Sequence, residues 1–129
     1  MNSESQKTGV SGSMVQKKID AFLSFLASRN AVDPYVQELS GDNGIADAII
    51  VAGATSGRHA QGIADGMRCV CRDNGWEFLG TEGYEQAQWI LVDGNDIIIH
   101  ILQEEARDLY RLEELFAAST RLREKESHQ

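Results

Sequence analysis

The clearest pattern of hydrophobic and polar positions lies in the second half of the chain. Residues 88–93 are a short run of strand-forming residues, and residues 96–102 form a second run, apolar beyond its first residue except at His100. Between the runs stand Gly94 and Asn95, two residues that tolerate the positive φ of a tight hairpin turn. The pattern therefore predicts an antiparallel hairpin, and the continuous apolar run predicts that its second strand is covered on both faces.

After this hairpin the apolar positions change to the period of a helix. Glu104 and Glu105 stand in its predicted first turn, where the helix dipole favours acidic side chains. The inward-facing positions are predicted to be Leu102, Ala106, Leu109, Leu112 and Phe116. The charged segment of residues 120–129 is predicted to fray as a tail, and residues 1–13, polar and rich in Ser and Gly, are predicted to be disordered.

Two further helices are predicted upstream. Residues 14–30 carry an apolar stripe with a polar back, and Pro34 stands beyond them, where a helix is broken. The second helix is predicted from about residue 57 to residue 74. Ser56 is placed to cap its start, and Gly75 stands where a left-handed stop is favoured.

The remaining apolar runs predict three strands. Residues 35–39 are predicted to form a strand near an edge, residues 46–53 a buried strand, and residues 76–79 a short strand. Strand–helix–strand in the middle implies a crossover connection, and the hairpin implies antiparallel pairing. The fold class is therefore α/β: one domain, residues 14–119, with a small mixed β-sheet flanked by helices.

The charge of the chain narrows the class of partner. With 12 Lys and Arg against 20 Asp and Glu, its formal net charge is −8, which argues against direct nucleic-acid readout and is compatible with a basic protein partner. Cys69 and Cys71 suit a reducing cytoplasm, the expected location. The polar N-terminus lacks the apolar core of a secretory signal, and no apolar run approaches membrane-spanning length.

Several short motifs resemble those of the Iojap family, the bacterial ribosomal silencing factors. The resemblance covers roughly residues 33–118 and is carried by Ala46-Asp47, Thr55-Ser56-Gly57-Arg58-His59, Ala64-Asp65, Glu82-Gly83, Trp89-Ile90-Leu91-Val92-Asp93, Asp96-Ile97-Ile98-Ile99-His100, Gln103-Glu104-Glu105-Ala106-Arg107, Tyr110 and Leu112-Glu113.

The resemblance implies a fold related to that of nucleotidyltransferases and a role that needs no chemistry. Members of the family bind the L-fourteen protein of the large ribosomal subunit, sterically block joining of the small subunit, and so repress translation when nutrients fail. Organellar relatives take part in large-subunit assembly. The resemblance also implies a homodimer. Two positions depart from the family, which usually has glycine at Ala54 and often tryptophan at Phe116.

The turn of residues 56–59 is the most enzyme-like stretch. Ser56, Arg58 and His59 stand at a helix N-terminus, where free amide protons attract anions, so the turn is either a phosphate or acidic-group contact or an ordinary capped turn. The alternative function is therefore a nucleotide-binding or nucleotidyl-transferring enzyme. A transferase also needs carboxylates on adjacent strands to hold metal, and that arrangement is not present; Asp93 and Asp96 are interpreted as turn residues.

No metal site or cofactor is expected, because the three histidines have no ligand spacing. His100 has three possible roles: a general base, a hydrogen-bonded structural residue, or a contact with a partner. Trp89 is interpreted equally as a core residue or an interface residue, and Tyr110 is of the same interface-rich type. Glu82, Glu104, Glu105 and Glu113 would make an acidic rim around the two aromatic residues.

We therefore expect docking on the ribosome to use residues of the hairpin and of the helix after it. The predicted contact residues are those where the motifs match and exposure is possible: Glu82, Trp89, Asp93, His100, Gln103, Glu104, Arg107 and Tyr110.

Overall fold

The computed structural model of the chain describes residues 9–39, 44–109 and 111–127. Five strands form one sheet in the order β1-β2-β5-β4-β3. Their bounds are Val32–Glu38 for β1, Ala48–Ala54 for β2, Gly80–Glu82 for β3, Trp89–Asp93 for β4 and Ile97–Gln103 for β5. Only β2 and β5 run parallel, and the other three neighbouring pairs are antiparallel. The mixed sheet and the antiparallel hairpin predicted from the sequence are confirmed.

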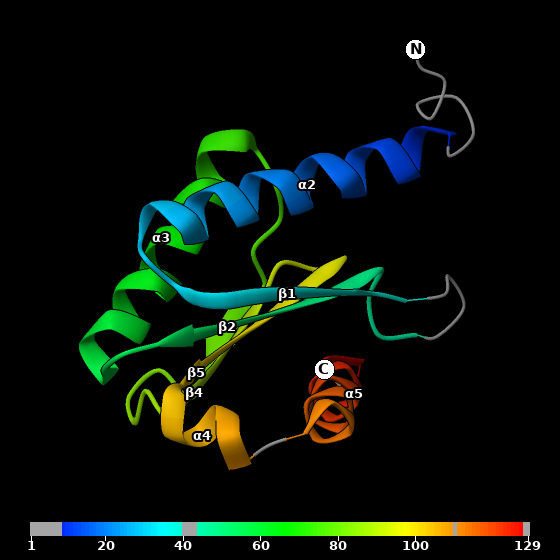
Figure 1. The fold of residues 1–129 in the computed structure, drawn as a ribbon. Coiled ribbons are helices and arrows are strands. Elements are labelled where there is room, and N and C mark those ends of the chain that lie inside the picture. Colours follow the sequence, from blue (N-terminus) through cyan, green and yellow to red (C-terminus); the bar gives the residue numbers. More distant parts are fainter. Residues whose placement is uncertain (1–8, 40–43, 110, 128–129) are drawn as a thin grey trace.

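Helices lie on both faces of the sheet. α2 (Gly9–Ser28) and α3 (Gly57–Asn74) cover the face that is uppermost in Figure 1, which we call the upper face. α4 (Glu104–Leu109) and α5 (Leu112–Ser127) lie against the opposite, lower face. The largest buried cluster joins the sheet to α2 and α3, and two smaller clusters lie on the lower face. Among the described residues, the upper face therefore holds the larger part of the buried core.

The two central strands are buried along their whole length. Every residue of β2 is buried, and so is every residue of β5 except Gln103. Each strand has a neighbour on either side and helices above and below, which is why both read as continuous apolar runs.

Local signals end the upper-face helices. The N–H groups of Asn30 and Ala31 donate to the carbonyl oxygens of Ala27 and Leu26 across the left-handed Asn30, so α2 stops before Pro34 is reached. At α3 the Ser56 side chain accepts from the His59 amide, and Gly75 adopts the left-handed conformation with φ of 70°. Both predicted caps of α3 are confirmed.

Both chain ends have more helix than predicted. α2 begins at Gly9, so residues 9–13 of the predicted disordered segment are helical. The single helix predicted after the hairpin is two helices, α4 and α5, and α5 continues to Ser127. The frayed tail predicted from residue 120 is therefore wrong up to that point, because Leu122 is buried against the lower face and holds the helix there.

Three local predictions also differ. The strand predicted at residues 76–79 is irregular, and β3 forms at Gly80–Glu82 instead. β1 starts at Val32, before Pro34, and carries an irregularity in its pairing there. The turn between β4 and β5 includes Asp96, and only Asn95 of the two predicted turn residues has positive φ. In the described part of the chain no helix is long and apolar enough to cross a bilayer.

Candidate functional site

The strand register brings one residue from each strand into a single row across the sheet. Tyr35 pairs with Val51, Val51 with His100, His100 with Leu91, and Leu91 with Glu82. Paired residues in neighbouring strands point to the same face, so all five belong to one face. Val51 and Leu91 pack in the clusters of the lower face, which places the whole row there.

Trp89 lies next to this row on the same face. It pairs with Leu102, so His100, two residues earlier along β5, is its diagonal neighbour across the strand pair. The two rings have centroids 5.9 Å apart and planes inclined at 42°. The Trp89 Nε1–H group donates to His100 Nδ1 at 3.0 Å, and the Trp89 side chain is half-buried. Part of its ring therefore remains open to solvent while its one polar group is used inside the molecule.

His100 is fully buried and bonded through both ring nitrogens. Because an indole nitrogen only donates, His100 Nδ1 must accept, and the ring proton lies on Nε2. Nε2 donates to Ser119 Oγ at 2.9 Å, and Ser119 Oγ donates to the Leu115 carbonyl oxygen at 3.1 Å. Each hydrogen bond fixes the direction of the next one, from the indole on β4 to the backbone of α5.

Burial also decides the charge of His100. It lowers the pKa of the imidazole to about 3, so the ring is neutral at physiological pH. Neither nitrogen is left to take a proton from a substrate, because one already accepts from Trp89 and the other donates to Ser119. The structure thus agrees with the interpretation of His100 as a hydrogen-bonded structural residue and gives no support to a general base.

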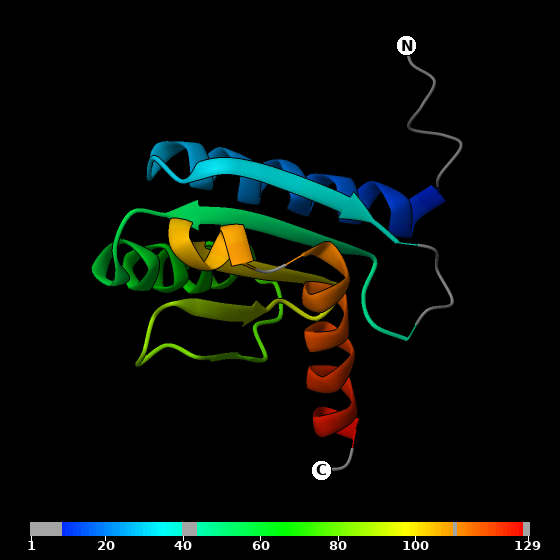
Figure 2. The ribbon, with the colours of Figure 1, turned by 60° about the horizontal axis from the view of Figure 1, so that its bottom comes forward.

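α5 contacts the lower face through a stripe that the sequence analysis missed. Its buried residues Leu115, Ala118, Ser119 and Leu122 recur at helical spacing. Leu115 packs in the cluster with Leu102, and Leu122 packs in the cluster with Ile98. Figure 2 shows that α5 runs across the strands rather than along them. The same spacing was readable in the sequence, but the predicted stripe used Leu112 and Phe116, whose side chains lie outside the described residues.

Three predicted contact residues form hydrogen bonds within the molecule. Asp93 is 2% exposed, and its Oδ1 accepts from the Asn95 amide at 2.9 Å, as expected of a turn residue. Gln103 Nε2 donates to the Ala87 carbonyl oxygen at 3.0 Å. Arg107 is half-buried and donates from Nη1 to the Val32 carbonyl oxygen at 2.6 Å. These bonds show that all three side chains support the fold, and the Gln103 side chain does so on the upper side, near the start of α3.

Arg107 holds the irregular start of β1. Its Nη2 donates to the carbonyl oxygen of Asp33, a residue with φ of 44°, while its Nη1 bonds the preceding carbonyl. A Cβ at position 53 on the neighbouring strand would lie 3.2 Å from Nη1, so Gly53 leaves room for the guanidinium. The side chain thus ties α4 to the edge strand β1.

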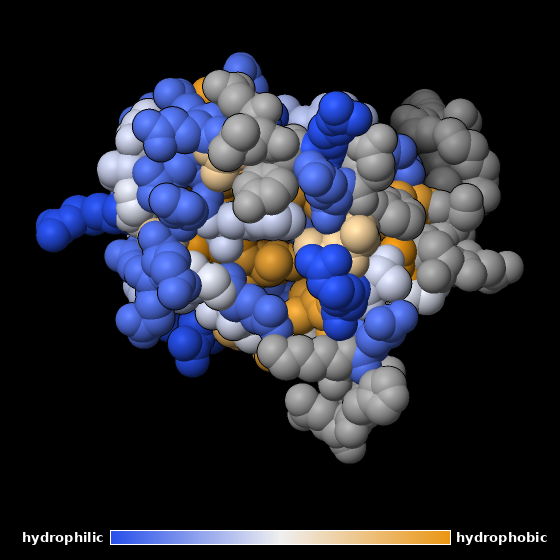
Figure 3. Space-filling model, turned by 90° about the horizontal axis from the view of Figure 1, so that it is seen from below, coloured by the Kyte–Doolittle hydropathy of each residue, from blue (hydrophilic) through white to orange (hydrophobic). Residues whose placement is uncertain are grey.

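The remaining predicted residues lie nearer to solvent. Glu104 and Glu105 are exposed in the first turn of α4, and Glu82 is half-buried at the outer strand β3. Tyr110 lies outside the described residues. Figure 3 views the molecule from below and shows apolar surface between hydrophilic side chains. Of the predicted set, the register thus places Glu82, Trp89, Asp93 and His100 on the lower face.

The turn of residues 56–59 is held by internal hydrogen bonds. The Ser56 Oγ accepts from the His59 amide at 3.0 Å. His59 Nδ1 accepts from the Thr55 amide at 3.0 Å, so Nε2 carries the proton and donates to the Arg29 carbonyl oxygen at 2.7 Å. These bonds join the start of α3 to the end of α2. Arg58 is exposed, and an anion contact at this turn stays a prediction.

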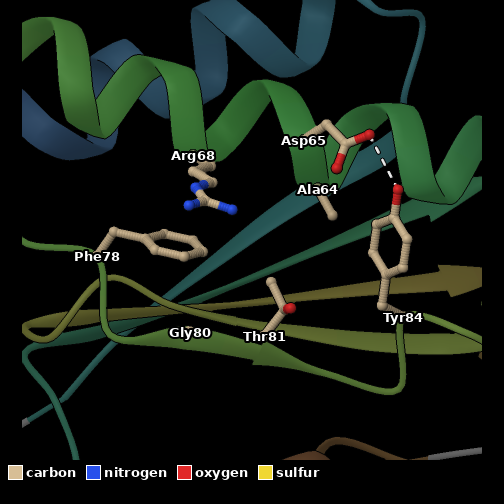
Figure 4. Close-up of a pocket in the computed structure, with 7 residues that line it drawn as sticks. All are labelled: Ala64, Asp65, Arg68, Phe78, Gly80, Thr81 and Tyr84. Atoms are coloured by element: carbon tan, nitrogen blue, oxygen red, sulfur yellow. Dashed lines mark hydrogen bonds between the residues drawn. The ribbon is translucent and has the colours of Figure 1, made fainter.

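A pocket of about 370 Å³ lies between α3 and β3, on the upper side of the sheet. Figure 4 shows Phe78 and Tyr84 at its two ends. The Tyr84 hydroxyl donates to Asp65 at 3.0 Å, and the Arg68 guanidinium lies 5.5 Å from the centroid of the Phe78 ring. A triphosphate would meet one cation and one carboxylate here, so this lining offers little to a nucleotide. In the described ranges, no three His, Cys, Asp or Glu residues could hold a metal ion.

Comparisons with known proteins agree on one family. The model of the family described as "Ribosomal silencing factor during starvation" matches residues 13–129. The chain is 39% identical over 80 residues to Ribosomal silencing factor RsfS of Haemophilus influenzae, an alignment that covers 62% of this chain and 78% of that protein. It is 34% identical over 93 residues to RsfS of Halalkalibacterium halodurans, covering 67% and 80% respectively.

Solved structures show the same fold. A crystal structure of a protein from Chromobacterium violaceum superposes with a TM-score of 0.73 and 25% sequence identity, and the match covers 79% of this chain and 85% of that one. A crystal structure from Bacillus halodurans gives a TM-score of 0.69 at 27% identity, covering 78% and 93%. Taken together with the sequence matches, this places the chain in the RsfS (Iojap) family of ribosomal silencing factors, which are non-enzymatic ribosome-binding proteins.

Proposed function

We propose that this chain docks through the lower face of its sheet onto the L-fourteen protein of the large ribosomal subunit and sterically blocks joining of the small subunit. Docking there represses translation when nutrients are limiting. Membership of the RsfS family supports a partner on the large subunit, because the family model and the relatives carry the name of ribosomal silencing factors. The cytoplasm is the proposed location, and a homodimer is part of the proposal.

One observation supports this surface above others: the half-buried Trp89 beside the row that crosses the sheet. Tryptophan is enriched in interface hot spots because it combines a large apolar area with few rotatable bonds. The Trp89 N–H group is already bonded to His100, so a partner meets the ring and not its polar atom. An apolar side chain or a Lys or Arg placed over the ring fits such a surface.

The charges near the surface favour a basic partner. The chain carries a net charge of −8, and Glu104 and Glu105 are exposed at the start of α4, directly after β5. Complementary charge of this kind speeds association and selects the partner, whereas the contact itself depends on the less polar centre. The proposal needs no catalytic group, and no observation at the 56–59 turn or in the upper pocket favours the alternative of a nucleotidyl-transferring enzyme.

Sedimentation with separated ribosomal subunits and capture by purified L-fourteen protein test the proposal. We expect wild-type protein to sediment with the large subunit alone and to be retained by L-fourteen. Trp89→Ala should lose both interactions. Met14→Ala is the matched control, because Met14 is an exposed apolar residue of α2, on the other side of the sheet. Sedimentation with the small subunit, or equal binding by Trp89→Ala and wild type, would contradict the proposal.

A further inference from the structure

The hydrogen bonds from Trp89 to α5 connect the candidate docking residue to the C-terminal helix. Trp89 bonds His100 on the neighbouring strand, and His100 bonds Ser119 on α5. His100 and Ser119 are both 0% exposed, so neither can touch a partner while α5 is in place. If they contribute to docking, they must act through Trp89.

The chemistry of the three groups makes this connection directional. The indole can only donate, and the Leu115 carbonyl can only accept, so one arrangement of protons satisfies all the bonds. Removing the Ser119 hydroxyl leaves the His100 Nε2–H group buried without its acceptor. A buried imidazole in that state gains by rotating toward another acceptor or toward water, and rotation moves Nδ1 away from the indole N–H group. The other tautomer brings no gain, because it would place a proton on Nδ1 facing that N–H group. Rotation of the His100 ring therefore weakens the hydrogen bond that holds the Trp89 indole.

We infer that Ser119 and His100 are positioning residues for docking: through them α5 sets the orientation of the Trp89 ring on the lower face. This inference rests on the proposed function, since it matters for binding only if Trp89 meets the partner. It assigns to α5, which lies on the same face of the sheet as Trp89, a part in shaping the docking surface through buried groups that make no contact with the partner.

The geometry favours orientation over simple packing. The indole N–H group of the half-buried Trp89 donates to His100, and His100 is itself bonded to Ser119 on α5. Apolar neighbours resist displacement of the ring but select its rotation weakly, whereas an indole N–H bond at 3.0 Å fixes the direction of the N–H vector. Loss of the Ser119 bond should thus change the ring's orientation more than the stability of the sheet.

Two indole N–H signals make the inference directly measurable. Trp89 and Trp76 are the two tryptophans of the chain, and Trp76 packs on the upper face against Phe22. In ¹⁵N–¹H spectra of Ser119→Ala we expect the Trp89 indole signal to shift and its hydrogen exchange to accelerate by roughly fivefold, the change that loss of about one hydrogen bond implies. The Trp76 signal should stay in place. If neither indole signal moves, the inference is overturned.

Binding to large ribosomal subunits is then measured for the same variant. Ser119→Ala should bind roughly fivefold more weakly than wild type, because the loss of about one hydrogen bond implies a change in affinity of that size. Ile63→Val is the matched control for stability, because Ile63 is a buried residue of α3 in the upper core and far along the chain from the docking residues. It should lower the melting temperature and leave affinity unchanged. If Ser119→Ala does not fold, Ser119→Cys, whose sulfur is a weaker hydrogen-bond partner, takes its place with the same expectations.

Trp89→Ala separates failure of the inference from failure of the proposed function. If Trp89→Ala binds weakly and Ser119→Ala binds as wild type does, positioning by α5 is wrong and the docking surface stands. If Ser119→Ala and Ile63→Val lose affinity in equal proportion to their loss of stability, the role of Ser119 is structural and the inference is also overturned. If Trp89→Ala binds as tightly as wild type, the proposed docking surface is wrong. The inference that Ser119 and His100 position Trp89 for docking is then overturned as well.

Discussion

The ring of Phe25 on α2 lies directly over Gly66 on α3, in the space that a side chain at position 66 would occupy. The nearest ring atoms lie so close that a Cβ built at Gly66 would overlap them. Gly66 therefore allows the two upper-face helices to approach each other, and this contact helps α2 to cover the sheet.

Two glycines of α3 should respond in opposite directions to alanine. Gly66→Ala should lower the free energy of unfolding by about 1–3 kcal/mol, because Phe25 must move to admit the methyl group. Gly62→Ala should raise it by about 0.5–1 kcal/mol, because nothing lies within 4 Å of a Cβ there and alanine favours the helix. Urea unfolding of both variants measures this. Equal effects of the two substitutions would contradict the contact. A second substitution that restores the stability of Gly66→Ala without any change at Phe25 would contradict it as well.

In the ion pair between Lys18 and Asp96, neutralising one partner should cost more stability than neutralising the other. Lys18 Nζ lies 2.8 Å from Asp96 Oδ1, and the side chains are 9% and 24% exposed respectively. Asp96→Asn leaves the more buried charge unpaired and should cost about 1–3 kcal/mol, whereas Lys18→Met leaves a better hydrated carboxylate and should cost less.

Asp73→Asn is the control for this pair. It breaks the exposed pair of Arg72 and Asp73, whose side chains are 71% and 68% exposed, and it should leave the urea midpoint unchanged. A larger loss of stability in Lys18→Met than in Asp96→Asn would contradict this prediction, because it would show that leaving the buried ammonium unpaired is not the more costly change.

The buried His100 should make stability depend on pH. Burial lowers the pKa of its imidazole from 6.5 to about 3, so between these values the unfolded chain binds a proton that the folded chain does not. The contribution to stability is complete above pH 6.5 and is lost as the pH falls toward 3. Between pH 7 and pH 5 wild type should lose about 2 kcal/mol more than His100→Leu. Parallel pH profiles for the two proteins would show that His100 titrates normally.

Neutralising the acids of α4 should slow binding to the ribosome. Glu104→Gln with Glu105→Gln removes two exposed charges at the start of α4, so association should slow and its dependence on salt should weaken. Stopped-flow mixing with large subunits at several salt concentrations measures the association rate and its dependence on salt. Asp20→Asn with Asp73→Asn removes the same charge from exposed positions on the other side of the sheet and should change association less. An equal effect of the two pairs would show that only net charge matters.

Features encoded by neighbouring residues were predictable from the sequence. The apolar runs of β2 and β5 report burial on both faces, and both are buried in the structure. Ser56 and Gly75 cap α3 as their residue types indicate, because each acts on backbone groups within a few residues of itself. The hairpin of β4 and β5 follows from the same kind of local signal.

Features that depend on distant partners were not predictable in this way. Arg107 bonds the carbonyl of Val32, 75 residues earlier, and His100 bonds Ser119, 19 residues later. Nothing near Ser119 in the sequence marks it as the acceptor of a buried histidine. α5 extends through a charged segment because Leu122 packs in one cluster with Ile98. The helical spacing of Leu122 does not reveal that partner.

Subunit joining tests the central claim most directly. Large and small ribosomal subunits are mixed under conditions that favour joining, and the joined fraction is measured by gradient sedimentation with added wild-type protein, Trp89→Ala or Met14→Ala. The account predicts that wild type and Met14→Ala lower the joined fraction, while Trp89→Ala leaves it near the value without added protein. Joining that proceeds undiminished with wild type present, or inhibition by Trp89→Ala equal to that by wild type, would contradict it.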